Sequence, residues 1–536
     1  MRPFVHLSLA ILSGLLFAFA WPERGWDFLI FFAFVPLFFI QQRLGDRNRG
    51  GIFWYAWLSF LIWNVLTTWW IWYSTDVGSL LAMGLNSLFV AIVFYVFHLS
   101  KKKLYQNRRG FFILLFYWIS WEYFHMNWDL TWSWLNLGNV FANSPAIIQW
   151  YEITGTLGGT AWVILVNIMV YHLIHLLLTS RHRRKLLLQV SILIFLVLAP
   201  VSYSLYLYNN YEEVYDPVEV VVVQPNTDPY NEQYERPAEE LLQKNLDLAS
   251  EAITDSTVFV LFPESTMYDG VNSIWENALS YAPLVRQLKA FIREYPQISV
   301  IIGASTYREI MPGEQPTHAA RKFRNADGYY YSYNTALFMD STDYAQIHHK
   351  SKLTPGVEIM PSWGILKPLE RLAIDLGGMT GTLGTEDHPV VFTSQQDIVV
   401  SPIICYESIY GAFVSKTIRE GAQAIFIITN DGWWGNTPGH RQHNTYAALR
   451  AIETRRSIAR SANTGISSII NQRGDFVQQT RYWEQDVIVA KINLNNEKTY
   501  YVKNGDYVAD ISIFVSALLV LLAITRTLMR KRSVLS

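Results

Sequence analysis

The chain has 536 residues, of which 51% are apolar, 15% aromatic and only 16% charged. This charge content is low for a soluble protein, and 43 basic against 44 acidic residues provide no general attraction to nucleic acid or acidic surfaces. The single cysteine excludes an internal disulfide and any cysteine-based zinc site. The length also exceeds that of one ordinary domain, so we expect the chain to be divided.

Long apolar segments fill the first 208 residues and recur once near the C-terminus. A helix that crosses the hydrocarbon core of a membrane needs about 20 apolar residues. The expected spans are 6–21, 26–42, 52–73, 79–100, 110–126, 158–178, 186–206 and 508–528. No convincing cleavage site follows the first segment, so we expect a retained helix rather than a signal peptide.

Lys and Arg cluster in every second connection between these segments. The basic clusters are at 43–49, 101–109, 180–185 and 526–533. The intervening connections, 74–78 and 127–157, are nearly free of Lys and Arg. Because basic loops stay in the cytoplasm, this alternation predicts that both termini are cytoplasmic. Residues 209–507 are then expected on the opposite face of the membrane.

The chain is therefore expected to have three parts. Residues 1–208 form a membrane domain with seven transmembrane helices, and residues 508–536 form a last transmembrane helix with a basic tail. Residues 209–507 have the composition of a soluble α/β protein. Their β-branched runs predict strands at 218–226, 256–265, 298–306, 333–340, 397–408, 422–431, 465–474 and 487–494.

Helical patterns at 276–296 and 443–462 lie between some of these strands. Short buried strands that alternate with helices are typical of a layered α/β domain. In such domains the catalytic groups are found at the ends of strands.

Cys405 closes the apolar run "VVSPIICYESIYG" (399–411). A thiol of ordinary pKa is only a few per cent thiolate at neutral pH, so a catalytic cysteine needs a base. His348 and His349 are adjacent and would point to opposite faces of a strand, whereas His440 and His443 lie at a helix start. None of the four sits in a recognisable Cys–His signature, which leaves a cysteine–histidine site open as an alternative.

Two further stretches place charged groups near the ends of strand-like segments. "VLFPES" positions Glu264, and "IHHKSKLTPGVE" positions Lys350 with Glu358 eight residues later. A carboxylate could take the thiol proton, while an ammonium group could keep the carboxylate ionised and stabilise an oxyanion. Each residue alone also has an ordinary explanation: a strand-end acid, a solvated lysine and a small buried cysteine.

The stretches "FPES", "HHKSKLTPGVE", "PIICYES" and "TNDGWWGNTPGHRQH", the last followed by "RAIETRR" and "NTGIS", resemble the nitrilase (carbon-nitrogen hydrolase) superfamily. With the flanking apolar helices, the resemblance narrows to the apolipoprotein N-acyltransferases and extends over the whole chain. It implies an α-β-β-α sandwich on the periplasmic side of a bacterial inner membrane.

The resemblance also implies site residues. By position, Glu264 would be the general base, Lys350 the electrostatic and oxyanion partner, and Cys405 the nucleophile. Glu358 corresponds to the second glutamate that such enzymes place near the triad. The chain departs from the family where "LTPGVE" replaces the usual "LVPFGE", and where "PNTDPYNEQY" stands in place of a frequent Trp.

Other residues around the triad follow from the same resemblance. Tyr406 would offer its backbone N–H to the oxyanion, and Glu407 occupies the family's "CYE" position. Asn430, Trp433 and Trp434 lie on the predicted external loop beside the site, and we expect this loop to contact substrate.

The implied chemistry is a two-step acyl transfer without metal or cofactor. The Cys405 thiolate attacks an ester of a membrane phospholipid, which gives a thioester and a lysophospholipid. The amine of a diacylglyceryl-modified N-terminal cysteine of an apolipoprotein then takes the acyl chain, so the kinetics would be ping-pong.

Two alternatives compete with this interpretation. In a membrane-tethered carbon-nitrogen hydrolase, water would resolve the thioester. A transporter or lipid-binding scaffold would instead require functional charges within the spans, which carry few.

Polar and aromatic residues of the membrane segments have ordinary interpretations. Glu122 could contact a lipid headgroup, but we expect it to reach the polar boundary by snorkelling. We expect His98, His172 and His175 to be interfacial rather than metal ligands. The aromatic stretch 126–141 is expected at the membrane–water boundary, with a lipid-holding arm as the alternative.

Overall fold

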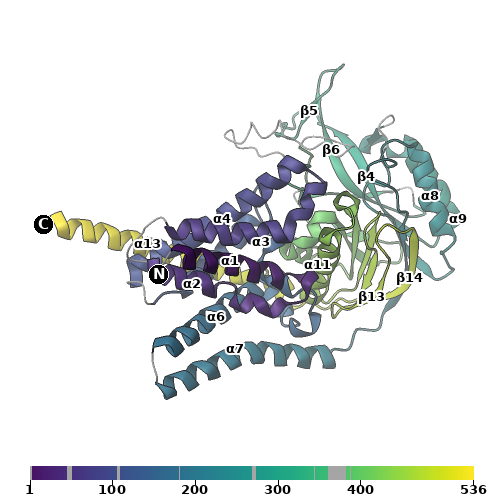
Figure 1. Cartoon of the computed structure of the whole chain (residues 1–536). Helices are drawn as coiled ribbons and strands as arrows, with labels where there is room; N and C mark the ends of the chain where they lie inside the picture. The colour runs from purple at the N-terminus through teal and green to yellow at the C-terminus, as the bar shows by residue number, and fades with distance from the viewer. Residues whose placement is uncertain are drawn as a thin grey trace.

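A computed structural model describes most of the chain, in which a bundle of helices joins an α/β part built on two sheets (Figure 1). The described residues are 3–44, 51–105, 109–179, 182–268, 273–342, 344–359, 382–386 and 388–535. Helix α13, at the C-terminus, returns to the helical part after the last strand (Figure 1).

The helical part is formed by the predicted apolar segments. Its helices are α1 (Pro3–Ala20), α2 (Val35–Leu44), α3 (Gly51–Thr68), α4 (Asp76–Tyr105), α5 (Phe112–His125), α6 (Tyr151–Thr179), α7 (Arg183–Asn210) and α13 (Tyr507–Leu535). Among the described residues, six segments are long and apolar enough to cross a membrane: Asp27–Leu44, Gly51–Tyr73, Asp76–Tyr105, Tyr151–Thr179, Arg183–Asn210 and Tyr507–Met529. The other two expected spans form the shorter helices α1 and α5, so eight crossings remain a prediction.

The orientation of the helices also remains a prediction. Residues 45–49, 106–108 and 180–181, which belong to three of the basic clusters, lie outside the described residues. Helix α7 buries none of its most apolar window against the rest of the protein. Its apolar surface faces outward, as expected for a helix surrounded by lipid.

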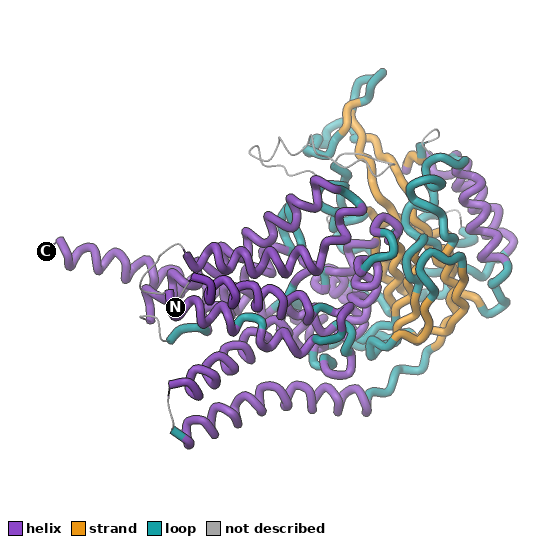
Figure 2. The backbone as a smooth tube through the Cα atoms, viewed as in Figure 1, coloured by secondary structure: helices purple, strands orange, loops and turns teal. Residues whose placement is uncertain are grey.

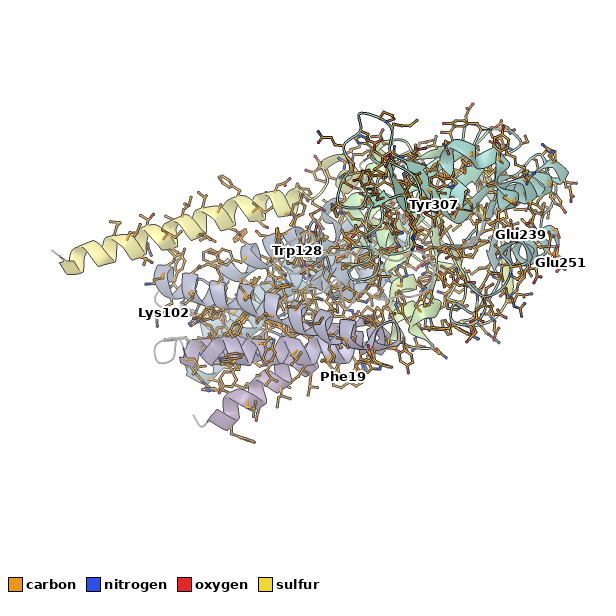
Figure 3. The ribbon with its side chains drawn as sticks, turned by 90° about the horizontal axis from the view of Figure 1, so that it is seen from above. Phe19, Lys102, Trp128, Glu239, Glu251 and Tyr307 are labelled. Carbon is orange, nitrogen blue, oxygen red and sulfur yellow. The ribbon has the colours of Figure 1, made fainter. Side chains whose placement is uncertain are left out.

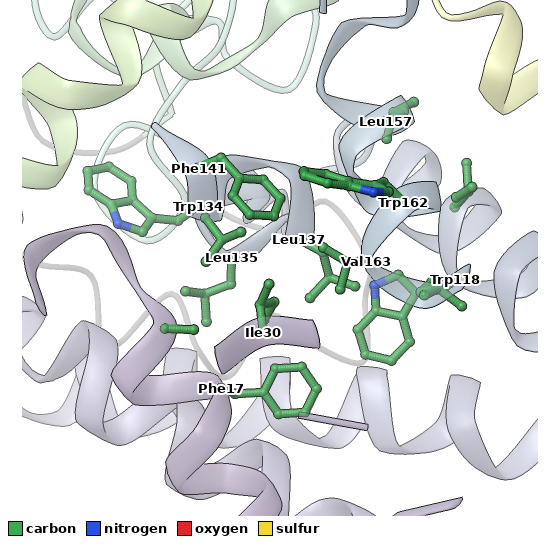
Figure 4. Close-up of a cluster of buried hydrophobic side chains, with 14 of the residues drawn as sticks. Phe17, Ile30, Trp118, Trp134, Leu135, Leu137, Phe141, Leu157, Trp162 and Val163 are labelled. Atoms are coloured by element: carbon green, nitrogen blue, oxygen red, sulfur yellow. The ribbon is translucent and has the colours of Figure 1, made fainter. Parts of the chain in front are cut away.

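Aromatic side chains form much of the core between the helices. Phe17 stacks on Trp63 with ring centroids 4.8 Å apart, and Phe34 meets Trp118 edge-on at 5.0 Å. Figure 4 shows the part of this core around Phe17, Ile30 and Trp118. The same cluster of buried apolar residues continues into the α/β part. The two parts therefore share one core, and packing fixes their relative positions.

Two sheets form the centre of the α/β part. In the first, the strand order is β14-β1-β2-β4-β6-β5, with β3 beside β4 and β7 beside β6. Its strands are β1 (Pro217–Gln224), β2 (Thr257–Leu261), β3 (Ile274–Trp275), β4 (Ser299–Glu309), β5 (Arg321–Lys322), β6 (Tyr329–Met339), β7 (Gln346–His349) and β14 (Asp486–Asn493).

The second sheet has the order β13-β12-β11-β10-β9-β8. Its strands are β8 (Phe392–Thr393), β9 (Val399–Ile404), β10 (Ala424–Thr429), β11 (Ile458–Ala462), β12 (Ser468–Ile470) and β13 (Phe476–Gln479). The inner faces of the two sheets share a core, in which the rings of Phe259 and Phe426 lie 5.0 Å apart.

Helices cover the outer faces of both sheets (Figure 2). Helices α8 (Ala238–Ser250) and α9 (Pro283–Glu294) pack on the first sheet, and α10 (Gly411–Arg419) and α11 (Pro438–Thr454) on the second. The expected layered α/β fold, with α-β-β-α layers, is thus confirmed, and each of the eight predicted strands overlaps a strand of the structure.

The helix predicted over 443–462 is wrong in its second half. Helix α11 ends at Thr454, and Arg455 adopts a left-handed conformation with φ of 51°. Residues 458–462 form strand β11, which is buried between β10 and β12. Pairing with two neighbouring strands outweighs the local helical pattern at this position.

Glu122 and His98 are buried rather than interfacial, which corrects both expectations. Glu122 is only 3% exposed, and it accepts hydrogen bonds from Trp118 Nε1, Leu137 N and Thr160 Oγ1 at 3.0, 2.8 and 2.6 Å. His98 is 1% exposed and its Nδ1 lies 3.2 Å from Gln41 Nε2. A buried polar group is stable only when it is hydrogen-bonded. Trp118 lies on the same helix as Glu122, whereas Leu137, Thr160 and Gln41 come from other segments. His172 and His175 are partly buried beside Tyr171.

The stretch 126–141 joins the two parts of the molecule, and its centre is buried in protein, so its place at a membrane–water boundary remains a prediction. Trp134 lies in the buried cluster of Figure 4. Its Nε1 donates to Gln442 Oε1 at 2.7 Å. Tyr446 donates to the carbonyl of Trp134, and Tyr406 donates to that of Thr131. Protein groups thus supply the hydrogen-bond partners that water would otherwise supply.

Candidate active site

Cys405 follows strand β9 and begins a short 3₁₀ turn, Cys405–Ile409. Its φ of 47° lies in the left-handed region, which is unusual for a residue with a side chain. Such backbone strain persists only where neighbouring groups hold it, and it is frequent at functional sites. This conformation was not apparent in the sequence.

Glu264 and Lys350 form a buried ion pair next to this turn. Glu264 lies three residues after β2, and Lys350 directly follows β7. Lys350 Nζ lies 3.1 Å from Glu264 Oε1 and 2.9 Å from Glu358 Oε1, and its side chain is only 2% exposed. The structure therefore brings together Glu264, Lys350 and Glu358, the three charged residues that the sequence analysis singled out.

Asn334 and Asn430 complete the surroundings of Glu264. The Asn334 amide donates to Oε1 of Glu264 at 2.7 Å and to Oε1 of Glu358 at 2.8 Å. The backbone N–H of Asn430 donates to Oε2 of Glu264 at 3.0 Å. Asn334 was missed in the sequence, because nothing in the β6 pattern distinguishes it. Asn430, predicted as a substrate contact, reaches Glu264 through its main chain.

The electrostatic surroundings keep the cysteine neutral and the lysine charged. Burial raises the pKa of the Cys405 thiol well above its usual range; the charge of Glu264 adds to this, and that of Lys350 opposes it. Burial alone would lower the pKa of Lys350, but the charges of Glu264 and Glu358 outweigh it and raise the pKa. A neutral thiol in this position needs a neighbouring base before it can react.

Glu407 joins the cysteine turn to the segment that carries Lys350. Its Oε2 accepts from the backbone N–H of Ile404 at 2.7 Å and lies 3.1 Å from His348 Nε2. Its Oε1 accepts from the backbone N–H of Ser351 at 2.6 Å. Glu407 therefore links the Cys405 turn to the segment that carries Lys350 through three hydrogen-bond contacts.

His443 is the histidine that lies against the cysteine turn. Its Nε2 is 3.1 Å from the carbonyl oxygen of Cys405 and 3.0 Å from Ser408 Oγ, and its Nδ1 is 2.8 Å from Asp431 Oδ1. His348 contacts Glu407, and His440 stacks on Tyr482. Of the histidines considered for the cysteine–histidine alternative, only His443 contacts Cys405, and it does so at the main-chain carbonyl.

The donor atoms of Cys405, Asp431 and His443 all lie within 4.8 Å of one another, a spacing that could hold a metal ion. However, Arg460 Nη2 lies 2.5 Å from Asp431 Oδ2 and supplies the positive charge next to this carboxylate. Both nitrogens of His443 already have partners. This group therefore does not fit a bound cation.

Cys405, Glu264 and Lys350 line one cavity of about 300 Å³ between the two parts of the molecule. Its wall on the helical side is mainly apolar and includes Ile71, Leu81, Leu85 and Phe89. Its other wall carries the charged groups. Such a shape suits a molecule with a long apolar chain and a reactive polar end.

The loop predicted to contact substrate is part of the cavity wall. Asn430, Trp433 and Trp434 all line the cavity. The Trp434 ring lies 4.8 Å from that of Trp70, and the Trp433 carbonyl accepts a hydrogen bond from Tyr230 at 2.7 Å. The loop is thus held against the helical part.

His349, next to Lys350, forms a separate charged cluster. Its Nε2 lies 2.7 Å from Glu276 Oε1 and its Nδ1 lies 3.2 Å from Glu386 Oε2, while its ring stacks on Tyr333 at 3.7 Å. Burial alone would lower the pKa of His349, but hydrogen bonds to the two carboxylates outweigh it and raise the pKa. Protonated His349 thus ties three segments together.

We expect His349→Gln to change how stability depends on pH. The folded-state pKa of His349 is raised above its unfolded value of about 6.5, so its stabilisation is complete below that pH. It is lost as the pH rises through the folded-state pKa. Thermal unfolding of the detergent-solubilised protein should show a midpoint that falls across this window in the wild type and falls less in the variant. Equal slopes would contradict the charge assignment.

Comparison with known proteins gives matches over both parts of the chain. The family model described as apolipoprotein N-acyltransferase N-terminal domain matches residues 13–169, and the carbon-nitrogen hydrolase model matches residues 220–501. An apolipoprotein N-acyltransferase of Chlorobaculum tepidum is 28% identical, and the alignment covers 97% of this chain and 96% of that protein. One of Geobacter metallireducens is 25% identical over 97% of this chain and 95% of its own length.

A solved amidase from Nesterenkonia sp. is 15% identical to this chain. The alignment covers 55% of this chain and 95% of the amidase, with a TM-score of 0.36, a value too low to support a conclusion. The family assignment depends instead on the sequence model of the α/β part. Because the carbon-nitrogen hydrolase model matches residues 220–501, more than half of the 536 residues, this chain belongs to the carbon-nitrogen hydrolase family.

Proposed function

We propose that the protein transfers an acyl chain from a membrane phospholipid to the N-terminal amine of a diacylglyceryl-modified apolipoprotein. The observation that carries this proposal is the cavity, in which Cys405, Glu264 and Lys350 face an apolar wall supplied by the helical part. The full-length similarity to proteins named apolipoprotein N-acyltransferase supports the same reaction.

In the first step, Glu264 takes the proton of the Cys405 thiol, and the thiolate attacks the carbonyl carbon of the phospholipid ester. Lys350 and the backbone N–H of Tyr406 stabilise the oxyanion, where each preorganised donor contributes about 3 kcal/mol. The carbon–oxygen bond then breaks, and the lysophospholipid leaves with the proton held by Glu264. The acyl chain remains on Cys405 as a thioester.

In the second step, the amine of the acceptor attacks the thioester carbonyl. Glu264 takes a proton from the amine, the carbon–sulfur bond breaks, and the thiolate regains a proton. The product is an amide. A thioester intermediate divides one difficult transfer into two easier steps, and the first product leaves before the acceptor reacts.

The proposed location is a bacterial inner membrane. Residues 1–208 and 508–536 lie in or beside the membrane, residues 209–507 are periplasmic, and both termini are cytoplasmic. The basic end of α13 supports this arrangement, because Arg526 bonds to the carbonyl of Leu104 at the basic end of α4. Lys102, at that end of α4, lies far from Glu239 of α8 and from Glu251, the residue after α8 (Figure 3).

Intact-protein mass spectrometry tests the function. The protein is incubated with phospholipid alone, and a mass increase of one acyl chain is expected. Addition of a diacylated lipopeptide should discharge the adduct and produce the triacylated peptide. If water discharges the adduct equally fast without lipopeptide, the protein is a hydrolase. If no adduct forms while phospholipid binds, the α/β part is a binding module.

Gly303 provides a test of the position of Glu264. A Cβ atom at Gly303 would lie 2.5 Å from the Cα atom of Glu264, so Gly303→Ala must displace the base. A displacement of about 1 Å costs roughly 100-fold in rate, and we expect a loss of that size in the acylation rate. Gly84→Ala is the matched control, because a Cβ there meets nothing within 4 Å. Unchanged acylation in the Gly303 variant would argue against Glu264 as the base.

A further inference from the structure

Two side chains hold the carbonyl group of Cys405. Ser408 Oγ donates to this oxygen at 2.8 Å, and His443 Nε2 lies 3.1 Å from it. The peptide bond between Cys405 and Tyr406 is planar and trans, so its C=O and N–H point in opposite directions. Because the carbonyl points to Ser408 and His443, the N–H of Tyr406 points away from them.

Hydrogen-bond geometry identifies His443 as a donor to this carbonyl. The hydroxyl proton of Ser408 is used on the Cys405 oxygen, so Ser408 cannot also donate to the imidazole. The Cys405 carbonyl oxygen can only accept, so its 3.1 Å contact with His443 Nε2 is a hydrogen bond when the proton is on Nε2; Arg460 Nη2, 3.2 Å from Nδ1, can donate to the other ring nitrogen. The assignment follows from the partners, as is usual for histidine tautomers.

The imidazole itself is held in place from its other side. His443 Nδ1 lies 2.8 Å from Asp431 Oδ1, which also accepts from Thr429 Oγ1 at 2.8 Å. Arg460 Nη2 lies 2.5 Å from the second oxygen of Asp431. The side chains of His443, Asp431 and Arg460 are fully buried. A fixed chain of contacts thus runs from Arg460 to the backbone of the nucleophile.

This chain of contacts stabilises the strained conformation of Cys405. With φ of 47°, Cys405 occupies a region that L-residues avoid unless other contacts compensate. Rotation of the 405–406 peptide would turn the N–H of Tyr406 toward Ser408 and His443. It would also leave both buried donors without an acceptor, which is unfavourable.

We propose that His443 is a positioning residue that keeps the Cys405–Tyr406 peptide oriented so that the Tyr406 N–H reaches the oxyanion. The oxyanion forms on the ester carbonyl oxygen in the first step and on the thioester carbonyl oxygen in the second. This inference depends on the proposed acyl transfer. It assigns His443 to the oxyanion site and leaves activation of the thiol to Glu264.

Two substitutions at position 443 separate these roles. His443→Met fills a similar volume without a donor, whereas His443→Gln places an amide N–H near the position of Nε2. Two rates are measured for each variant: acylation of Cys405 by phospholipid, and alkylation of Cys405 by iodoacetamide. Alkylation needs the thiolate but forms no oxyanion, so it reports only on thiol activation.

We expect His443→Met to lower the maximal acylation rate roughly 100-fold, with an unchanged half-saturating phospholipid concentration. Its alkylation rate should stay within about threefold of the wild type across pH, because the oxyanion donor contributes only to acyl transfer. His443→Gln should recover most of the acylation. If His443→Met does not fold, Ser408→Ala removes the other donor and should give the same selective loss.

Two results would overturn the inference. Wild-type acylation in His443→Met would show that the carbonyl needs no such support. A parallel loss of acylation and alkylation would show that His443 acts on the thiol. Failure of the proposed function is recognised separately, because the wild-type protein would then be alkylated by iodoacetamide but not acylated by phospholipid.

Discussion

Cys405→Ser should leave a protein that forms no acyl adduct with phospholipid and no triacylated product with lipopeptide. A serine hydroxyl is a much weaker acid than a thiol, and Glu264 in a buried site cannot generate its alkoxide. Loss of a catalytic nucleophile lowers kcat by on the order of 10⁶-fold, which is below detection. Intact-protein mass spectrometry measures the adduct, and hydroxylamine releases it if it is a thioester.

Cys405→Ala is the control for folding. Cys405 packs at the edge of the core between the two sheets, and a change from cysteine to alanine removes only one sulfur atom. We expect a thermal unfolding midpoint close to that of the wild type. Because Cys405 is the only cysteine, any thioester must be on this residue. An acyl adduct on the alanine variant would refute its assignment as the nucleophile.

Lys350→Met should lower the acylation rate by roughly 10² to 10³-fold, which is the typical cost of removing one oxyanion donor. The substitution also removes the cation that lies 3.1 Å from Glu264 and 2.9 Å from Glu358. Two buried carboxylates would then face each other without a counter-charge. Breaking such a pair on one side costs about 3–5 kcal/mol, so we also expect a lower unfolding midpoint.

Lys352→Met is the matched control for this experiment. Lys352 Nζ contacts the carbonyl of Met126 at 3.2 Å and the ring of Tyr410, but neither carboxylate of the site. Its acylation rate should stay within a few fold of the wild type. Acylation at the wild-type rate in Lys350→Met, measured on folded protein by the same mass assay, would remove Lys350 from the mechanism.

The helical part does more than anchor the catalytic part. Gln442 and Tyr446 of α11 form hydrogen bonds with stretch 126–141. Tyr406, next to Cys405, donates to the carbonyl of Thr131 in the same stretch. The cavity needs both parts for its walls. We therefore expect acyl transfer to depend on the intact chain, because one wall of the cavity comes from the helical part.

The features that could be predicted from the sequence are those with a local signal. Apolar length marks the helices, β-branched runs mark the strands, and Glu264, Lys350 and Cys405 each follow a recognisable strand. These signals arise from residues close in the chain, where side-chain period and turn chemistry depend on neighbours. Their convergence on one cavity could be inferred from the sequence only through resemblance to a family.

The hydrogen-bond partners of the site residues come from distant segments, and no local sequence pattern predicts them. Asn334 reaches Glu264 across 70 positions, and His443 reaches Cys405 across 38. Glu122 is buried because Leu137 and Thr160 supply donors that a helix in isolation would lack. Burial and hydrogen bonding depend on which segments pack together. The orientation of the Cys405 peptide, the hydrogen bonds to Glu264 and the contacts between the two parts are therefore decided only in the folded chain.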